Sequence, residues 1–387
     1  MNVVKDWAYR NLKGDPVIWL VVFLLSLFSI VVVYSATGSL AYKMMDGNTE
    51  YYLIKHSALV LISLFAVWLA HKVDYRYYAK ISRFLLWISV PLLLFTWLFG
   101  TNINEASRWI TIPIINQAFQ PSDLAKLALL ITLASMLTKK QADIDDFKKA
   151  IIPMLVWIGL ICGLIAMTNF STAILLFFTC MLLLFLGRVP IRYLVLLVMI
   201  GALAGTAAIF IGQRGPTVIS RVEKFMNQEQ SFQSQQAYVA IATGGIFGKG
   251  PGQSDQRNYL PHPYSDFVYA IILEEYGLLG GLFVLLLYLT LLYRGMKATF
   301  NSERPFGGLL SSALTFALVL QAMVNMGVAV GLGPVTGLPL PLLSMGGTSQ
   351  LFMGLALGIV ISVSRGKIDT EDDKLENAIR EEVPEAA

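Results

Sequence analysis

Long apolar runs dominate the chain, and polar residues gather between them. A helix that crosses a bilayer needs about 20 mostly apolar residues, and about ten segments meet that requirement. They are residues 16–37, 52–70, 82–100, 121–138, 150–167, 170–187, 191–212, 267–293, 307–330 and 345–364. Little more than Thr168 and Asn169 joins the fifth to the sixth, which predicts a tight hairpin. The pattern predicts an all-α polytopic membrane protein with about ten transmembrane helices.

These spans form a single transmembrane domain over residues 16–366. A short polar stretch, 1–15, precedes the domain, and a charged tail with few aromatic residues follows it at 367–387. A charged segment of this kind buries too little apolar surface to fold, so we expect the tail to be disordered. The longest connector, about 213–266, lies between the seventh and eighth spans.

Positive charge is divided unequally between the two sides of the predicted bundle. About 20 of the 29 lysine and arginine residues fall on the side that carries both termini and the even-numbered loops. Loops rich in lysine and arginine stay in the cytoplasm. Both termini are therefore predicted to be cytoplasmic and the long connector extracytoplasmic, which agrees with an even number of spans.

The composition excludes several classes of protein. Hydrophobic residues make up 56% of the chain and charged residues only 14%, against roughly 25% charged in an ordinary soluble domain. The net charge of +4 includes no basic tract with interleaved aromatics, so no nucleic-acid partner is predicted. Cys162 and Cys180 fall in apolar runs and imply no disulfide framework.

Three outward-facing segments are more polar, or richer in glycine and proline, than simple connectors. They are residues 104–126, 213–266 and 331–349. All three fall on the same predicted side of the membrane. A site built from them would open outward.

Asp123 and Lys126 begin the fourth span and are spaced i, i+3, so they share a helix face and can pair. A charge within the bilayer costs about 2.5–3.5 kcal/mol, which pairing or a wet cavity would offset. Two interpretations stand: a structural ion pair, or the wall of a cavity that presents a cation to an anionic substrate. Pro121 and Ser122 suit the first turn of this helix.

Two more cations on the outer side also have two interpretations each. Arg108 beside Trp109 is either an interfacial anchor or a guanidinium that grips a phosphate. Lys249 lies in a glycine-rich run, 244–252, that lacks the spacing of a phosphate-binding Walker loop. That run is either a plain tight turn or a turn whose lysine touches phosphate.

The long connector opens with an amphipathic stretch. Its apolar residues recur at helical spacing, with charged residues between them: Val218, Ile219, Val222, Phe225 and Met226. The spacing predicts a helix that lies flat on the outer surface of the membrane.

Asp266 stands at the outer mouth of the eighth span. Aspartate is a good helix cap, but Ser265 could cap equally well and leave the carboxylate free. Glu274 and Glu275 follow within the same apolar helix. Two adjacent buried carboxylates are costly and predict specific partners.

Several motifs, in one order along nearly the whole chain, carry a resemblance to a known family. They read ASRWI, FQPSDLAK, GGIFGKGPGQS, YLPHPYSDFVYAIILEEYGLLG and PVTGLPLPLLSMGGTS. This set resembles the SEDS family (shape, elongation, division and sporulation). The last two motifs look closer to the division branch, FtsW, than to the elongation branch, RodA.

The resemblance implies a peptidoglycan glycosyltransferase in the bacterial plasma (inner) membrane, acting in cell division with its active site facing outward. Family members polymerise lipid II, an undecaprenyl-pyrophosphate-linked disaccharide-pentapeptide. They work beside a class B penicillin-binding protein transpeptidase and other divisome proteins, among membrane lipids. The aspartate of the YSDF segment, Asp266, is then the expected catalytic carboxylate.

The resemblance also supplies the expected substrate-binding residues. These are Lys126, Asp123, Arg108, Gln120, Ser122, Lys249, Glu274, Ser344, Gly346 and Gly347. No cofactor is certain, and a divalent cation (Mg²⁺ or Mn²⁺) held by Asp266 or Asp123 stays open. This chain departs from the family at QPSD for the usual QPSE, at Asn169 for a frequent acidic residue, and at His262 and Tyr264 for Glu and His.

The predicted reaction is an inverting glycosyl transfer with Asp266 as general base. Lys126 and Arg108 would stabilise the pyrophosphate that leaves. Two rival functions stand beside it: a lipid II flippase, and a non-catalytic scaffold of the division machinery. The unusual polar residues gather on the outer side, which favours chemistry there over transport.

Overall fold

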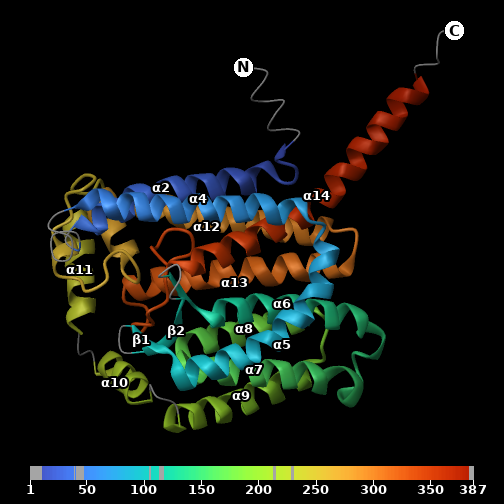
Figure 1. The fold of residues 1–387 in the computed structure, drawn as a ribbon, viewed down its shortest axis with the longest axis horizontal. Helices are drawn as coiled ribbons and strands as arrows, with labels where there is room; N and C mark the ends of the chain where they lie inside the picture. The colour runs from blue at the N-terminus through green and yellow to red at the C-terminus, as the bar shows by residue number, and fades with distance from the viewer. Residues whose placement is uncertain are drawn as a thin grey trace.

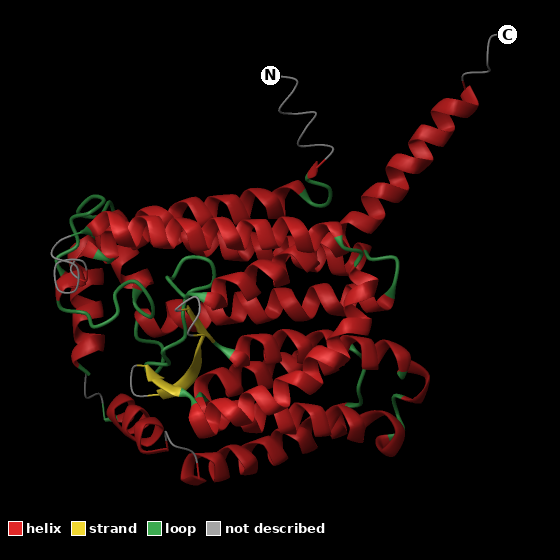
Figure 2. Cartoon of the chain, viewed as in Figure 1, coloured by secondary structure: helices red, strands yellow, loops and turns green. Residues whose placement is uncertain are grey.

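The computed structural model describes residues 11–382, with gaps at 39, 41–47, 104–105, 113–116, 212–214 and 228–230. Long helices run side by side across the molecule, and most connecting loops gather at its two ends (Figures 1 and 2). The helices are α2 (Pro16–Ala36), α4 (Thr49–Lys72), α5 (Tyr75–Phe99), α6 (Pro121–Lys139), α7 (Ile152–Thr168), α8 (Phe170–Leu186), α9 (Ile191–Ile211), α10 (Gly215–Met226), α11 (Phe232–Gly244), α12 (Val268–Asn301), α13 (Pro305–Ala329) and α14 (Thr348–Glu382).

The predicted spans are confirmed, helix by helix. Within the part of the chain that the structure describes, nine helices are long and apolar enough to cross a membrane, and α8 is a shorter apolar helix. Seven of these ten helices start and end within about three residues of their predicted boundaries, whereas α5 begins seven residues earlier, α12 ends eight residues later and α14 ends eighteen residues later. One difference is a turn of π-helix, Phe147–Ile151, that leads into α7.

Asp15 joins α2, α12 and α14 at one end of the bundle. Its carboxylate caps α2 by accepting from the Val17 N–H at 2.9 Å, and it also accepts from Arg294 Nε at 2.7 Å. Its own N–H donates to Ser364 Oγ of α14 at 3.0 Å. The start of the first span and the end of the last therefore meet at the same end of the bundle (Figure 1). That this end faces the cytoplasm stays a prediction.

Helix α6 is buried on nearly every side. It contacts α5, α7, α8, α13 and α14, and most of its residues have almost no exposed surface. A helix that is apolar all round belongs in the interior of a bundle. The charged first turn of α6, with Asp123 and Lys126, is thereby carried into the middle of the molecule.

Helices α14 and α4 pack with their backbones in close approach. A Cβ atom at Gly354 would lie 2.7 Å from the Ser63 carbonyl oxygen, and one at Gly358 would lie 2.5 Å from the Val67 carbonyl oxygen. Small residues four apart allow such contact between membrane helices. Ser63 Oγ also donates to the Gln350 carbonyl across the same interface at 2.7 Å.

A small sheet, absent from the prediction, fills the connector before α6. Its strands are β1 (Thr101–Ile103), β2 (Ala106–Ile112) and β3 (Gln117–Phe119). They pair antiparallel in the order β1-β2-β3, with Ile110 opposite Phe119. Isoleucine, threonine and tryptophan in β2 favour strand pairing, a signal too short to compete with the ten long apolar runs.

The predicted disordered tail differs from the structure as far as Glu382. Helix α14 continues beyond the last span to that residue, and it leaves the bundle (Figure 1). Residues 367–382 include four glutamates, two lysines and one arginine, which are good helix formers.

The amphipathic stretch in the long connector is a helix, α10, as predicted. Its apolar side chains Ile219, Val222, Phe225 and Met226 are exposed on the protein surface. An exposed apolar face on a charged helix suits the boundary between lipid and water. Contact of α10 with the membrane surface stays a prediction.

The α4–α14 contact predicts that Gly358→Ala destabilises the protein by about 1–3 kcal/mol, because the added methyl group meets rigid backbone. Thermal unfolding of the purified protein in detergent measures the loss. Gly163→Ala on α7 is the matched control, since its added Cβ meets nothing within 4 Å. Equal melting temperatures for the two variants would contradict the close-approach account.

Candidate active site

Asp266 lies at the mouth of α12 without serving as its cap. The helix begins at Val268, and its cap residue, Phe267, makes no side-chain capping bond. Ser265 Oγ instead donates to Asp266 Oδ1 at 2.9 Å. The capping interpretation is wrong, and the half-buried carboxylate is free for other work.

The loop between α13 and α14, residues 330–347, fixes the backbone beside this carboxylate. Ser344 is buried, and its hydroxyl donates to the Ser265 carbonyl at 2.6 Å while accepting from the Leu340 N–H at 2.8 Å. The Met345 N–H donates to the Tyr264 carbonyl at 2.9 Å. Ser344 therefore positions the segment that carries Asp266, and its contact with substrate stays a prediction.

Helix α13 holds the same segment from the other side. Asn325 Nδ2 donates to the carbonyl of Asp266 at 2.9 Å and to that of Leu338 at 2.7 Å. One turn earlier, Gln321 Nε2 donates to the Pro339 carbonyl at 2.8 Å. Two amides at i, i+4 spacing thus bind the loop and the segment that carries Asp266 to one helix face.

Asp123 and Lys126 pair as the spacing predicted. Lys126 Nζ lies 2.7 Å from Asp123 Oδ1, and Ser349 Oγ donates to Asp123 Oδ2. Asp123 is buried with 5% of its side chain exposed, whereas Lys126 keeps 23% exposed. The lysine therefore presents its ammonium group outward while the aspartate anchors it.

The other predicted residues of this motif reinforce the anchor. Gln120 Nε2 donates to Ser122 Oγ at 2.8 Å, and the Gln120 N–H donates to Thr348 Oγ1 at 3.3 Å. These bonds tie the start of α6 to the start of α14, next to Ser349.

Lys126 opens into a cleft between α6, α8, α13 and α14, which we call the Lys126 cleft. Leucines and other apolar side chains form most of its walls, and a few polar groups interrupt them: Asp123, Lys126, Thr172, Thr179, Gln321 and Ser349. A single exposed cation above apolar walls suits an amphiphile with an anionic head group.

One loop and one helix connect this cleft to Asp266. The segment from α13 to α14 carries Ser344, which binds the Asp266 segment, and leads into Ser349, which binds Asp123. Gln321 lines the cleft one turn from Asn325, which holds the Asp266 carbonyl. Asp123 and Asp266 are more than a hundred positions apart in the sequence, and these hydrogen bonds connect both of them to the same loop and the start of α14.

Gly346 and Gly347 form the turn that starts α14. The Ser349 N–H donates to the Gly346 carbonyl at 3.1 Å, and the Gln350 N–H donates to the Gly347 carbonyl at 3.3 Å. Gly347 has a φ of 56°, which favours glycine. Arg108 belongs to β2, but its side chain lies outside the residues that the structure describes.

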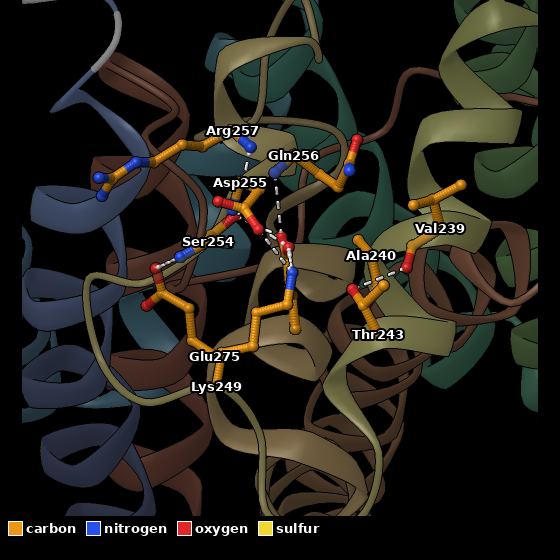
Figure 3. A network of polar contacts seen from close by, with 10 residues as sticks. Val239, Ala240, Thr243, Lys249, Ser254, Asp255, Gln256, Arg257 and Glu275 are labelled. Atoms are coloured by element: carbon orange, nitrogen blue, oxygen red, sulfur yellow. Dashed lines mark hydrogen bonds and ion pairs between the residues drawn. The ribbon is translucent and has the colours of Figure 1, made fainter.

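Lys249 and Glu274 form a separate buried network, seen close up in Figure 3. Lys249 Nζ lies 2.6 Å from Glu274 Oε1 and 2.9 Å from Asp255 Oδ2. Glu274 also accepts from the N–H groups of Asp255 at 3.1 Å and Gln256 at 3.3 Å, and from the Ser254 hydroxyl. The hydrogen bond to Glu274 is the main reason that the Lys249 pKa is raised.

Glu275 has partners of its own, as two adjacent buried carboxylates require. It accepts from the Ser35 hydroxyl and from the Ser254 N–H at 3.3 Å, and Arg257 Nη1 reaches Ser35 Oγ at 3.2 Å. Neither Lys249 nor Glu274 is among the described side chains that line the Lys126 cleft. Both residues have a structural role in the polar network, and their contact with substrate stays a prediction.

The glycine-rich run before this network repairs a break in α12. Gly277 has a φ of 66° inside the helix, which frees backbone groups on both sides of it. Loop groups replace the lost helical bonds: Lys249 N–H to Glu274 O and Gly250 N–H to Glu275 O at 2.9 Å each, Leu278 N–H to Gly245 O at 3.0 Å, and Leu279 N–H to Ile246 O at 3.3 Å. A Cβ at Gly248 would lie 2.2 Å from the Glu275 carbonyl oxygen. The run is therefore neither a phosphate loop nor a plain turn.

The described residues do not by themselves form a complete metal site. No three histidine, cysteine, aspartate or glutamate side chains lie close enough to hold a metal ion there. Mg²⁺ often uses only one or two carboxylates together with substrate phosphates. A divalent cation at Asp266 or Asp123 would take that form and stays a prediction.

The family of the chain follows from comparison with known proteins. A family described as "Cell cycle protein", which groups FtsW, RodA and SpoVE, matches residues 15–368. This chain belongs to that family. The SEDS resemblance carried by the motifs is thus confirmed over nearly the whole length.

Individual FtsW/RodA/SpoVE relatives cover almost all of the chain. Stage V sporulation protein E of Bacillus subtilis (strain 168) is 32% identical over 369 residues, which is 91% of this chain and 98% of that protein. The probable peptidoglycan glycosyltransferase FtsW of Hydrogenovibrio crunogenus is 30% identical over 390 residues, 98% of each chain. Proteins named FtsW from Geobacter and Aliivibrio match similarly, which supports the division branch.

Solved structures of FtsW/RodA/SpoVE proteins share the fold. A chain from a structure titled for the coordination of polymerization and crosslinking by a peptidoglycan synthase complex superposes with a TM-score of 0.73 at 26% identity, covering 92% of this chain and 98% of that one. The rod shape determining protein RodA of Thermus thermophilus gives 0.67 at 25% identity, covering 92% and 97%.

Four residues at or near the site were not predicted from the sequence: Ser349, Gln321, Asn325 and Arg221. Ser349 was inside a quoted motif but was not singled out, although it anchors Asp123. Gln321 and Asn325 carry amides at i, i+4 spacing in an otherwise apolar helix. That spacing could have predicted a polar stripe with partners inside the protein. Arg221 is one of the charged residues of the amphipathic stretch, and burial lowers its pKa while the charge of Asp266 opposes that shift.

The Ser344 bonds predict that Ser344→Ala loosens the catalytic segment. The change removes two buried hydrogen bonds and leaves their partners unsatisfied, so we expect a loss of about 1–3 kcal/mol, read as a lower melting temperature. Ser312→Ala is the matched control, because Ser312 is buried but bonds only the Leu309 carbonyl of its own helix. A smaller loss for Ser344→Ala than for Ser312→Ala would contradict this role.

The Lys249–Glu274 pair predicts a stability defect for Lys249→Ala of about 2–4 kcal/mol, because a fully buried carboxylate loses its cation. Since the Lys249 pKa is raised, the pair contributes fully at neutral pH and up to about pH 10.5, and its contribution is lost as the pH rises through the raised value. Thermal unfolding of the wild type and of Lys249→Ala, at pH 7 and above pH 10.5, measures the stability defect and its dependence on pH. Lys297→Ala, at an exposed lysine, should change little; an unaltered melting temperature for Lys249→Ala would refute the structural role.

Proposed function

We propose that this chain is a peptidoglycan glycosyltransferase that polymerises lipid II in the bacterial plasma membrane during cell division. The observation that carries the proposal is the placement of Asp266. A half-buried carboxylate, unused by its helix, is held by the same loop and helix that frame an apolar cleft with one exposed cation. The names of the relatives support the substrate and the reaction.

Asp266 acts in this mechanism as the general base. The 4-hydroxyl of one lipid-linked sugar attacks the anomeric carbon of another, and Asp266 takes the hydroxyl proton as the new C–O bond forms. The bond from the anomeric carbon to the pyrophosphate breaks, and the pyrophosphate keeps both electrons. Single displacement inverts the anomeric centre, as expected for an α-linked donor and a β-linked polymer.

The Lys126 cleft supplies binding for a lipid-linked pyrophosphate. The ammonium of Lys126 neutralises part of the phosphate charge, while the leucine-rich walls accept an isoprenoid chain. Asp123, fixed by Ser349, keeps the lysine directed into the cleft. A site of this kind explains why a sugar polymerase is embedded in a bilayer.

A transpeptidase partner and an outward-facing site complete the proposal. The superposed structure from a peptidoglycan synthase complex supports a class B penicillin-binding protein partner. The excess of lysine and arginine on the side of both termini supports an extracytoplasmic position for Asp266.

The proposal predicts that Asp266→Asn abolishes glycan synthesis without unfolding the protein, because the amide cannot take the proton. Purified protein is incubated with fluorescent lipid II in detergent, with and without its partner, and glycan length is read on a gel. Lys126→Ala is expected to reduce the rate at least 100-fold. Asp145→Asn, at an exposed aspartate, controls for the loss of a carboxylate.

The same assay separates the rival functions. Wild-type-like polymer from Asp266→Asn would end the assignment of the base. Absence of polymer from the wild-type protein, even with its partner, would favour a flippase or a scaffold. Lipid II translocation in vesicles would then distinguish those two.

A further inference from the structure

His56 of α4 is a buried histidine inside the bundle, with 1% of its surface exposed. Its Nε2 lies 2.8 Å from the hydroxyl oxygen of Ser29 on α2. The same hydroxyl donates to the Leu343 carbonyl, in the loop between α13 and α14, at 2.9 Å. His56 therefore reaches, through one serine, the loop that fixes the segment before Asp266.

These contacts determine which nitrogen of His56 carries the proton. A carbonyl oxygen can only accept, so the single proton of the Ser29 hydroxyl is directed to Leu343. The hydroxyl must then accept from His56, which requires an N–H at Nε2. Nδ1 is buried and has no hydrogen-bond partner among the described residues. A second proton there would create a buried charge without a partner, so the imidazole is neutral and donates at Nε2.

The stretch of backbone that Ser29 holds is strained. Leu342 has a φ of 62°, in the left-handed region that leucine rarely adopts. Such a conformation persists only where the surrounding structure holds it. Hydroxyl groups from the bundle bind the carbonyls on both sides: Tyr288 of α12 donates to the Pro341 carbonyl, and Ser29 donates to the Leu343 carbonyl. The conformation of this turn therefore depends on Ser29.

The residue that follows the strained turn binds the segment before Asp266. Ser344 comes directly after Leu343, and its hydroxyl donates to the Ser265 carbonyl at 2.6 Å. A rotation of the backbone at 342–343 would move the Ser344 hydroxyl with it. The Ser265 hydroxyl in turn donates to Asp266 Oδ1 at 2.9 Å. A displacement of the turn is thus passed on to the carboxylate through two serines.

We propose that His56 is a positioning residue for Asp266. As the neutral Nε2–H tautomer, it keeps the Ser29 hydroxyl directed at the Leu343 carbonyl. The turn held in this way sets the place of Ser344 and of the carboxylate. This inference rests on the proposed function, because the place of Asp266 affects the rate only if that carboxylate takes the proton. The role requires no contact between His56 and the reacting atoms.

Two amide substitutions separate the hydrogen bond of His56 from the space that its ring fills. Glutamine reaches about as far as Nε2 and offers an N–H to Ser29, whereas asparagine reaches only about as far as Nδ1. In the lipid II polymerisation assay, His56→Asn is expected to lower kcat about tenfold and to change KM less than about twofold, because a misplaced base slows the reaction without weakening binding. His56→Gln should recover most of the loss.

Ser29→Ala tests the same link from the other side. The change removes the bond to Leu343 and is also expected to lower kcat about tenfold. Ser89→Ala is the matched control, because Ser89 is equally buried but donates to the Leu85 carbonyl of its own helix, α5. The double variant His56→Asn, Ser29→Ala should be no slower than Ser29→Ala alone, since both changes break one chain of contacts.

Hydrogen exchange measures the positioning without turnover. The amides of residues 343–345 are bonded within the loop or to the segment before Asp266. Their exchange, followed by mass spectrometry of the protein in detergent, is expected to be about tenfold faster in His56→Asn and in Ser29→Ala. His56→Gln and Ser89→Ala should exchange as the wild type does. Melting temperatures establish that each variant is folded.

The outcomes separate this inference from the proposed function. Equal kcat for His56→Asn and His56→Gln, or equal losses for Ser29→Ala and Ser89→Ala, would overturn the positioning role even in an active polymerase. Unchanged exchange in both His56→Asn and Ser29→Ala would overturn it whether or not the protein makes polymer. Faster exchange in those two variants of a protein that makes no polymer would keep the link to the Asp266 segment and end the glycosyltransferase proposal. If His56→Asn fails to fold, Ser29→Ala and its control decide the matter.

Discussion

The loop between α13 and α14 holds the candidate site together, because its buried hydrogen bonds reach both halves of it. Ser344 fixes the segment before Asp266, and the residue that follows the loop, Ser349, fixes Asp123. Irregular backbone at membrane depth is tolerated only where its polar groups have partners within the protein. Asn325 and Gln321 supply such partners from α13, so the loop is rigid enough to set the geometry of a reaction.

The buried charges of this protein divide into two kinds. Asp15 and Glu274 accept hydrogen bonds on both carboxylate oxygens and Glu275 on one, and these bonds join helices and loops. Asp266 and Lys126 each keep part of their side chain exposed at the site. Burial alone therefore does not mark a functional carboxylate; the informative feature is a charge whose partners leave one side open.

Much of the fold was readable in the sequence because the bilayer imposes a simple length requirement. The spans appeared as apolar runs, and the Asp123–Lys126 pair followed from i, i+3 spacing. The small sheet around β2 was missed because its strands are shorter than the pattern being sought. The partnership of Lys249 with Glu274 was missed because 25 residues separate them, and only the break at Gly277 brings them into contact.

The site shows the same division between local and long-range information. The motifs drew attention to Asp266, but nothing local in the sequence indicates that Ser344 bonds the carbonyl of Ser265 or that Arg221 bonds the carbonyl of Val335. Those contacts depend on how α10 and the α13–α14 loop fold back over the mouth of α12. A single sequence does not reveal these contacts, because neither a serine nor an arginine is unusual at these positions.

The repaired break in α12 has a mechanical consequence. The loop at 245–250 and the helix at 274–279 exchange backbone hydrogen bonds, so neither can open without exposing the amides of the other. The two segments form one cooperative unit in the sense of native-state hydrogen exchange. If the turns of α12 before Gly277 tilt during turnover, the loop at 245–250 must move with them. The position of Asp266 is then coupled to the position of this loop.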